Sequence, residues 1–273
     1  MAKLTLKVAI SSCGSIARRH AKNLQGRADL YFHSRSFEKS EAMAREFGGQ
    51  AFKGSFEDLV SEDKINGIII CSPPELHFDQ AKLALQASKN VLVEKPLCVS
   101  PEDLELLDQC AQENPRTFLG VAENYYYKPS FKKIRSLIER GVIGDLRRLD
   151  IKKLSMQNPG AWKTKYGALL QGGIHFVALM NGLVGKPFKK LKAEIDARDK
   201  VERTSSLFVE YENKIQARLR YSWNRPALLK GLFQHSRIEG SEGLFVFESN
   251  GIYMNFRSYR MGAPAFIPFF KDI

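Results

Sequence analysis

The sequence predicts an α/β domain built on a doubly wound parallel sheet, residues 1–120, followed by an α+β domain with a large, mostly antiparallel open sheet, residues 121–273. Three observations lead to this fold class. A chain of 273 residues is long enough for one or two domains. Strand-like and helical segments alternate through the first half, which is typical of parallel strands joined by helices. The second half consists mainly of long strand-like runs.

The strands of the first half are apolar runs that end in turns. Residues 67–72 read GIIICS, a continuous apolar run of the kind expected for a strand buried on both faces. In chain order, the expected strands are residues 6–11, 29–36 with an exit turn, 67–72, 90–97 and 116–124.

Helical segments fill the intervals between these strands. Gly48 closes the second helix, and the last one starts with Ser100 as N-cap, Pro101 at the first helical position and Asp103 at the third. The expected helices are residues 15–26, 37–48, 75–89 and 100–114.

The second half begins with a helix at residues 130–141, and a further helix at 167–185 interrupts its strands. Residues 211–214 and 248–251 have the composition of hairpin turns. The expected strands are residues 145–156, 205–213, 214–224, 236–243, 244–250 and 251–258.

The composition is that of an ordinary globular protein, with 44% hydrophobic and 26% charged residues. No apolar run approaches the roughly 18 residues needed to span a bilayer, and the first residues lack a secretory leader pattern. We therefore expect a cytoplasmic protein without membrane contacts. The four cysteines are widely spaced, so neither a disulfide framework nor a metal site is expected.

The formal net charge of +12 suits an anionic partner, such as nucleic acid or a phosphorylated small molecule. The basic residues are scattered along the chain and lack the interleaved aromatic residues of a single-strand binding surface. A solvated basic surface explains most of this charge, and nucleic-acid binding is the least favoured function.

The segment between the first strand and the first helix is similar to the dinucleotide fingerprint G-x-G-x-x-G/A, with Ser12, Gly14 and Ala17 at its three positions. Gly14 allows close approach of a pyrophosphate, and the amides at Ser15 and Ile16 begin a helix that favours negative charge. Ser12 departs from the pattern, so the tight turn has to form without its usual glycine.

The end of the second strand bears on cofactor choice. Ser34 stands where an NAD-binding domain carries an acid for the ribose 2′-hydroxyl, and Arg35 follows it. A missing carboxylate and an added guanidinium favour a 2′-phosphate. NADP(H) is therefore favoured and NAD(H) stays open, with a surface-loop role for Arg35 as the alternative.

Several segments together resemble the Gfo/Idh/MocA oxidoreductases. Residues 67–97 contain the motifs SPPELH and EKP, residues 120–149 resemble the segment that links the two domains, and residues 167–179 resemble the active-site helix. The similarity covers nearly the whole chain. It implies a Rossmann domain and an open-sheet α/β domain that move a hydride between a nicotinamide and, usually, a sugar or cyclitol carbon.

The resemblance also implies residue roles. Lys95 would lie near the nicotinamide and the substrate hydroxyl, where an ammonium stabilises alkoxide charge or relays a proton, and His175 would lie beside the reacting carbon. Further cofactor contacts would be Ser72, Pro73, Pro74, His77, Glu94 and Asn124. Further substrate contacts would be Tyr125, Trp162, Lys163 and Gln171. Each has a structural alternative: EKP as a strand end with a surface ion pair, His77 as a satisfied helix residue, Trp162 as core, and Tyr125–Tyr127 as strand-like packing.

Gln171 is a departure from the family pattern, which usually has Asp at this position. Glutamine can hydrogen-bond but cannot accept a proton in this role. His175 could act with Lys95 alone, Gln171 could orient the substrate, or the chain could be a catalytically silent NAD(P)-sensing regulator. Because Lys95 and His175 remain, we favour an enzyme.

The expected substrate is a carbohydrate-like alcohol or ketone. The basic surplus, which includes Lys128, Lys163 and Lys165, leaves an anionic sugar derivative open. Relatives cover the exposed face of the second sheet with another subunit, which predicts a homodimer or homotetramer. Alternating apolar positions in the strands of this sheet are Leu207, Val209, Ile215, Ala217 and Leu219.

Overall fold

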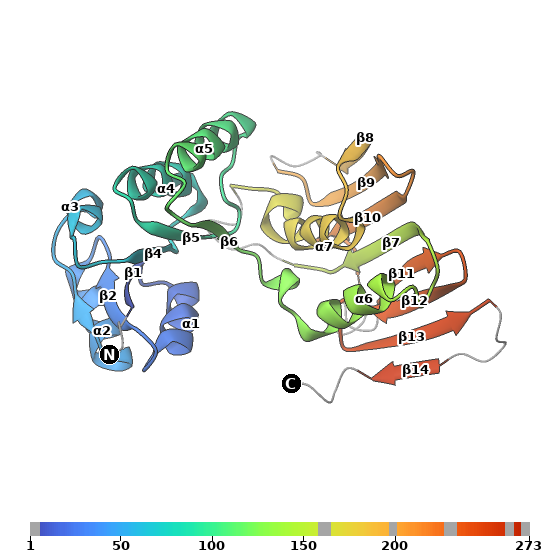
Figure 1. Ribbon diagram of the computed structural model, residues 1–273, viewed down its shortest axis with the longest axis horizontal. Coiled ribbons are helices and arrows are strands. Elements are labelled where there is room, and N and C mark those ends of the chain that lie inside the picture. The colour runs from blue at the N-terminus through green and yellow to red at the C-terminus, as the bar shows by residue number, and fades with distance from the viewer. Residues whose placement is uncertain (1–5, 158–164, 197–200, 227–233, 260–264, 269–273) are drawn as a thin grey trace. The chain divides into compact units, whose positions relative to one another are not determined.

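The computed structural model describes residues 6–157, 165–196, 201–226, 234–259 and 265–268. The chain divides into two compact units, Met1–Ala122 and Glu123–Ile273. The first unit holds a six-stranded sheet and the second an eight-stranded sheet (Figure 1). All strand pairs in the first sheet are parallel, whereas the second is antiparallel except for the β7–β10 pair. This is the predicted fold class.

The first sheet has the strand order β3-β2-β1-β4-β5-β6. The chain therefore reverses its direction of travel across the sheet between β1 and β4, the place where open α/β sheets bind ligands. The strands are β1 Lys7–Ser11, β2 Asp29–His33, β3 Gln50–Ala51, β4 Gly67–Ile70, β5 Asn90–Glu94 and β6 Leu119–Ala122.

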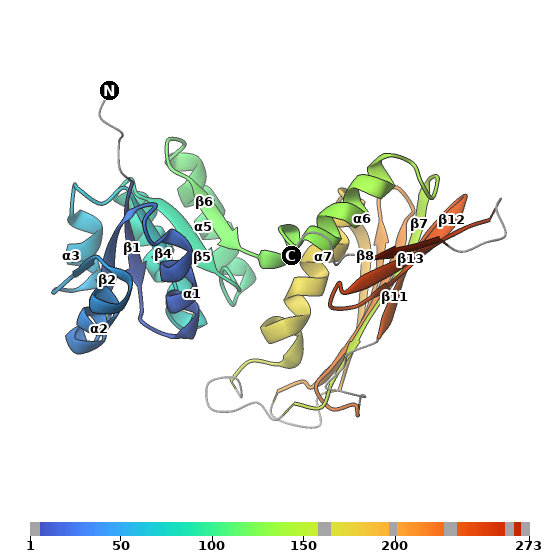
Figure 2. The same cartoon turned by 90° about the horizontal axis from the view of Figure 1, so that it is seen from below.

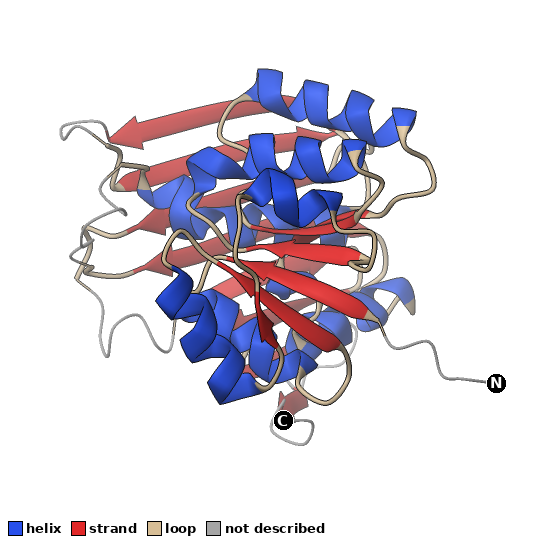
Figure 3. Ribbon diagram, turned by 90° about the vertical axis from the view of Figure 1, so that its left-hand side faces the viewer, coloured by secondary structure: helices blue, strands red, loops and turns tan. Residues whose placement is uncertain are grey.

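Helices cover both faces of this sheet (Figure 3). Alternate residues of β1 show this: Ile10 packs in one apolar cluster with Ala17 and Met43, and Ala9 packs in another with Ala81. The helices are α1 Ser15–Leu24 and α2 Phe37–Phe47 in the first cluster, and α3 Phe56–Ser61, α4 His77–Gln86 and α5 Pro101–Glu113 in the second.

The predicted helix ends are confirmed where the sequence carries a specific cap. The Ser100 hydroxyl accepts the Asp103 amide at 3.1 Å, and Gly48 closes α2 with a φ of +72°. The sequence prediction missed β3 and the short helix α3. Ser55 and Asp58 form a reciprocal capping box at the start of α3, a signal present in the sequence.

The second sheet has the strand order β14-β13-β12-β11-β7-β10-β9-β8. The two predicted hairpin turns are confirmed, with Lys214 and Gly251 at positive φ. Strands β8 and β14 were not predicted. The strands are β7 Leu146–Leu154, β8 Phe188–Asp196, β9 Thr204–Tyr211, β10 Gln216–Ser222, β11 His235–Gly240, β12 Gly243–Glu248, β13 Tyr253–Ser258 and β14 Ala265–Pro268.

Helices α6 Pro129–Glu139 and α7 Ile174–Val184 cover one face of this sheet (Figure 2). The apolar positions that the sequence suggested for a subunit interface are wrong for that purpose. They are buried in the core beneath these helices, because strand alternation points them toward the unit's own apolar layer. These core residues are Leu207, Val209, Ile215, Ala217 and Leu219.

Two further expectations about local structure are corrected. Residues 123–127 do not continue the strand, because the Glu123 side chain accepts the Tyr125 amide at 2.9 Å and caps a 3₁₀ turn, Asn124–Tyr126. The tyrosines therefore do not alternate as in a strand. The expected helix at 167–185 begins with a π-helical turn, Leu169–Gly173, before α7, and ends at Gly185 in the left-handed conformation.

Candidate active site

The loop between β1 and α1 forms a phosphate-binding type of turn with serine at its first position. Ser12 has a φ of +79°, in the left-handed region that glycine enters most easily. Gly14 is the N-cap of α1, and a Cβ added to it would meet no protein atom closer than Ser12 Oγ at 4.0 Å. The space beside Gly14 is open, so this turn fits a pyrophosphate at the start of a helix.

A cavity of about 530 Å³ lies at the carboxyl ends of β1, β2 and β4. Its described lining includes Ser12 and Gly14, the predicted pair Ser34 and Arg35, and Lys39 of α2. No Asp or Glu is among these lining residues. The two cations of this lining, Arg35 and Lys39, suit an anionic ligand such as a 2′-phosphate. Of the other expected contacts, Ser15 and Ile16 form the first turn of α1 outside this lining.

His33 lies in the same lining and is 8% exposed. Its Nε2 is 3.2 Å from the Gly54 carbonyl oxygen, and its buried Nδ1 has no hydrogen-bond partner among the described residues. Burial lowers the pKa of His33 below its ordinary value of 6.5. The cavity therefore has a neutral imidazole in its lining at neutral pH.

The SPPELH and EKP motifs are tied together by His77. Its Nδ1 lies 2.7 Å from the Pro96 carbonyl oxygen and its Nε2 lies 2.8 Å from that of Ser72. Ser72 and Pro73 line the cavity, whereas Pro74 and His77 are buried outside this lining. The geometry thus gives His77 a supporting position that holds two loop segments together.

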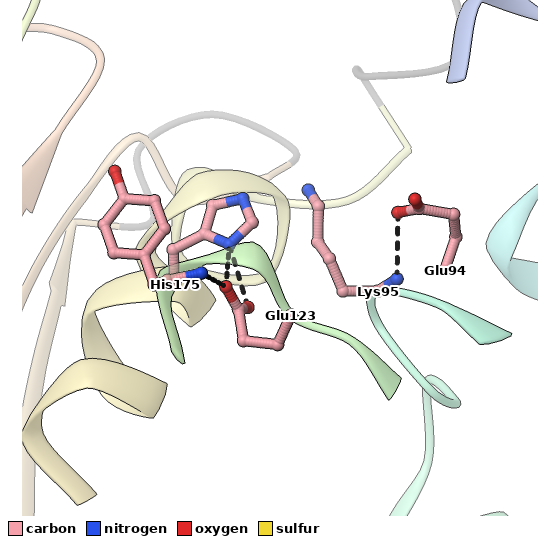
Figure 4. Close-up of polar contacts among 5 residues, drawn as sticks. Glu94, Lys95, Glu123 and His175 are labelled. Carbon is pink, nitrogen blue, oxygen red and sulfur yellow. Dashed lines mark hydrogen bonds and ion pairs between the residues drawn. The ribbon is translucent and has the colours of Figure 1, made fainter. Parts of the chain in front are cut away.

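Glu94 fixes the strand end that carries Lys95. Its carboxylate is 2.8 Å from His20 Nε2 of α1. The same carboxylate accepts the backbone amide of Lys95 at 3.3 Å (Figure 4). The Glu94 side chain is 13% exposed, so this is a partly buried pair and not a surface ion pair. The Lys95–Pro96 peptide bond is cis.

In the second unit, a π-helical turn carries Gln171, which is 9% exposed. Gly172 lies against Tyr221, because an added Cβ would be 2.1 Å from Tyr221 Oη. Glu202 accepts the amides of Ala168 and Leu169 at the start of this helical segment. Burial raises the pKa of Glu202, although these hydrogen bonds act in the opposite direction.

His175 has a carboxylate partner that the sequence did not suggest. Both oxygens of Glu123 contact its Nδ1, at 2.7 and 2.8 Å (Figure 4). The Tyr125 ring stacks on the imidazole with a centroid distance of 4.8 Å and an interplanar angle of 9°. The described residues provide no hydrogen-bond partner for His175 Nε2. The imidazole is therefore held on one edge and one face, with Nε2 left for a ligand.

The remaining predicted contacts are placed as follows. Asn124 is exposed in the 3₁₀ turn. The ammonium of Lys128 lies 3.9 Å from the centroid of the Tyr125 ring, and burial lowers the pKa of Lys128. Trp162 and Lys163 lie outside the described residues.

Sequence reasoning missed three residues with clear positions in these sites: Lys39, Glu123 and Glu202. Glu123 had a signal, since it follows a strand end directly and precedes the expected contacts Asn124 and Tyr125. Its pairing with His175 spans 52 positions and could not be inferred from spacing. Glu202 likewise acts across 33 positions.

Two family models match the chain. One, described as the oxidoreductase family with an NAD-binding Rossmann fold, matches residues 6–122. The other, described as the GFO/IDH/MocA C-terminal domain, matches residues 131–246. Together they cover most of both units.

Two proteins similar to this chain carry the names of sugar oxidoreductases. A dTDP-3,4-didehydro-2,6-dideoxy-alpha-D-glucose 3-reductase of Streptomyces violaceoruber is 30% identical over 67% of this chain and 56% of its own length. A glucose-6-phosphate 3-dehydrogenase of Bacillus subtilis is 26% identical over 78% of this chain and 64% of its own length. The matched regions thus span less than two thirds of these relatives.

Solved structures share the fold. An NAD-binding oxidoreductase from Klebsiella pneumoniae aligns with a TM-score of 0.86 at 20% identity, over 97% of this chain and 79% of that one.

Within the described residues, no helix is long and apolar enough to cross a membrane. The same residues contain no cluster of three or more His, Cys, Asp or Glu side chains suited to a metal ion.

Proposed function

This chain belongs to the Gfo/Idh/MocA oxidoreductase family, and from that membership we propose that it is an NAD(P)-dependent dehydrogenase or reductase acting on a sugar, a cyclitol or a related hydroxy or keto compound. The observation that carries the proposal is the cavity at the carboxyl ends of β1, β2 and β4, with Gly14 open to a pyrophosphate. When bound there, the nicotinamide cofactor supplies the hydride acceptor or donor. The residues of the chain bind the cofactor and move the proton.

The preferred cofactor in this proposal is NADP(H). Arg35 and Lys39 line the cavity together with Ser34, and the described lining contains no carboxylate that would repel a 2′-phosphate. NAD(H) binding is the alternative that a direct comparison of the two cofactors tests.

Lys95 and His175 are the proposed catalytic residues. Lys95 would stabilise alkoxide charge on the substrate oxygen, and His175 would exchange the hydroxyl proton. Gln171 would contribute a hydrogen bond to the substrate, since an amide offers both a donor and an acceptor. Asn124 and Tyr125 are proposed contacts because they share one turn with the carboxylate that holds His175.

The proposed substrate is a carbohydrate-like alcohol or ketone, and an anionic derivative is included. Two relatives are named for a nucleotide sugar and a sugar phosphate. In this chain, Lys128 lies over Tyr125, which itself stacks on His175. A cation over the ring that stacks on the proposed acid–base residue favours a substrate with a negative group.

We also propose that the protein forms a homodimer or homotetramer through the outer face of the second sheet. This face carries both signs of charge, including Asp150 in an ion pair with Arg220 at 3.1 Å. Arg218 lies over the Phe208 ring at 5.0 Å on the same side. Light scattering of the purified chain, compared with an Arg218→Glu variant, tests this assembly.

The first test of the proposed function is a fluorescence titration with NADPH and, separately, with NADH. We expect NADPH to bind at least ~10-fold more tightly, which corresponds to about 1.4 kcal/mol. Arg35→Ala should remove most of this preference. Arg45→Ala is the matched control, since Arg45 is an exposed arginine of α2 outside the cavity lining. Tighter NADH binding would refute the 2′-phosphate assignment.

Turnover over a panel of polyols, sugars, sugar phosphates and nucleotide sugars is the second test. Lys95→Ala and His175→Ala should lose activity while cofactor binding is retained. Unchanged turnover in both variants would refute the catalytic assignment. Cofactor binding without turnover on any substrate would favour the NAD(P)-sensing regulatory alternative.

A further inference from the structure

The position of Glu123 extends the proposed function to a residue that the sequence motifs do not single out. We propose that Glu123 is the acid partner of His175: it accepts the Nδ1 hydrogen of the imidazole and so leaves Nε2 as the atom that exchanges a proton with the substrate. Glu123 acts through His175 and is therefore a positioning residue. The proposal rests on the proposed function for its chemistry, but its geometry stands independently.

The carboxylate of Glu123 lies beside His175 and has one other hydrogen-bond partner in the described part of the chain, the Tyr125 amide. Its side chain is 6% exposed, so its charge needs partners in the protein. The partners found among the described residues are His175 Nδ1, at 2.7 and 2.8 Å, and the Tyr125 amide, at 2.9 Å. A carboxylate that is ionised can only accept, so Nδ1 has to carry a hydrogen.

The same turn also fixes the orientation of the imidazole. The Tyr125 ring lies parallel to it at 4.8 Å, while the Glu123 carboxylate binds its edge. Rotation of the ring would break either the stack or the hydrogen bonds. Since a general base works only when its lone pair faces the proton, this fixed orientation directs Nε2 at one position.

With this arrangement, every proton and electron pair of the reaction has a donor and an acceptor. In the oxidation direction, the substrate hydroxyl would give its proton to Nε2 as the carbonyl forms, and a bound oxidised nicotinamide would supply the acceptor for the C–H hydrogen and its electron pair. The imidazolium that results has hydrogens on both nitrogens and is stabilised by the Glu123 charge. In the reduction direction the imidazolium returns the Nε2 proton to the substrate oxygen.

Gln171 fits this arrangement. It lies four positions before His175, is nearly buried, and brings no charge. Two ionised carboxylates around one imidazole would repel each other. With the acid at position 123, a neutral side chain at 171 keeps a single negative charge next to the ring.

The decisive variant is Glu123→Gln, which preserves shape and removes the charge. We expect kcat to fall about 100-fold, with the dissociation constant of NADPH unchanged within about twofold. The half-maximal pH of the oxidation rate should also move downward, since the imidazolium loses its counter-charge. Glu212→Gln, in an exposed turn, is the control and should match the wild type.

A second variant tests whether an acid, and not merely this side chain, is needed. Glu123→Gln combined with Gln171→Asp returns one carboxylate to the neighbourhood of His175 and should recover at least ~10-fold of the lost kcat. A Glu123→Gln enzyme with unchanged kcat and unchanged pH profile would overturn the proposal. Recovery in the double variant would exclude loss of fold as the cause of the single variant's defect.

A measurement without turnover separates this inference from the proposed function. Nitrogen-15 spectra of the wild-type protein report which ring nitrogen of each of its five histidines is protonated. The His175 signal is identified by its loss in His175→Gln. A neutral ring protonated at Nδ1 supports the proposal even if no substrate is turned over. A neutral ring protonated at Nε2 overturns it even if the chain is an active oxidoreductase.

Discussion

Substitution of Gly172 by alanine tests the packing of the π-helical turn that precedes His175. The added Cβ would lie 2.1 Å from Tyr221 Oη and 3.0 Å from Tyr221 Cζ. Tyr221 cannot move aside easily, because its ring is 5% exposed and its Oη accepts Trp223 Nε1 at 3.2 Å. Overpacking costs about 1–3 kcal/mol and the lost hydrogen bond about 1 kcal/mol, while alanine returns about 1 kcal/mol through helix propensity.

The net expectation for Gly172→Ala is a loss of about 1–3 kcal/mol in the free energy of unfolding. For a domain of this size that corresponds to a Tm decrease of about 3–10 °C. Thermal unfolding followed by tryptophan fluorescence measures it, since Trp223 contacts the displaced ring. Tyr221→Phe removes the closest atom, so the two substitutions together should show a favourable coupling of about 1 kcal/mol. Strict additivity, or a Tm unchanged by Gly172→Ala, would refute the packing argument.

Two further predictions concern the cofactor cavity. Lys39→Ala should weaken NADPH binding about 10-fold and leave NADH binding unchanged, because its ammonium would serve the 2′-phosphate alone; equal weakening of both cofactors in fluorescence titrations would contradict this. Because burial lowers the pKa of His33 below 6.5 in the folded protein, the stability gained from a neutral imidazole is complete above pH 6.5 and is lost as the pH falls below that value. Tm measured in apo protein should decline below pH 6.5 less steeply in His33→Gln than in the wild type, and parallel declines would show that His33 does not contribute.

Local signals made much of the fold predictable. The Ser100 cap, Gly48 at the end of α2 and the two hairpin turns are each decided by a few neighbouring residues. The continuous apolar run of β4 is likewise a local signal, and its residues are buried on both faces of the sheet. Family resemblance then supplied the roles of these elements, which local patterns do not contain.

The unpredicted features depend on contacts between distant residues. The alternating apolar pattern of β9 and β10 predicted two different faces but not which face α6 and α7 would cover. Strand β8 has a weaker apolar alternation and contains several basic residues, so the sequence pattern did not indicate a strand. Its apolar residues Leu191 and Ile195 are exposed. The π-helical turn depends on Tyr221 and Glu202, both far along the chain from Gly172.

The pairing of Glu123 with His175 also depends on residues that are distant in the sequence. Comparison with the family motif shows Gln171 where an aspartate is usual. From the motif alone, this difference suggests that the proton-transfer function is lost. The imidazole of His175 needs a carboxylate nearby in space, and that carboxylate can come from any part of the chain. Glu123, which directly follows β6, contacts Nδ1 of His175 with both carboxylate oxygens. Because the same carboxylate also caps the turn that carries Tyr125, one side chain orders both the edge and the face of the imidazole. A histidine with these contacts needs no acid one helical turn away, so the amide at 171 is compatible with a working proton-transfer site.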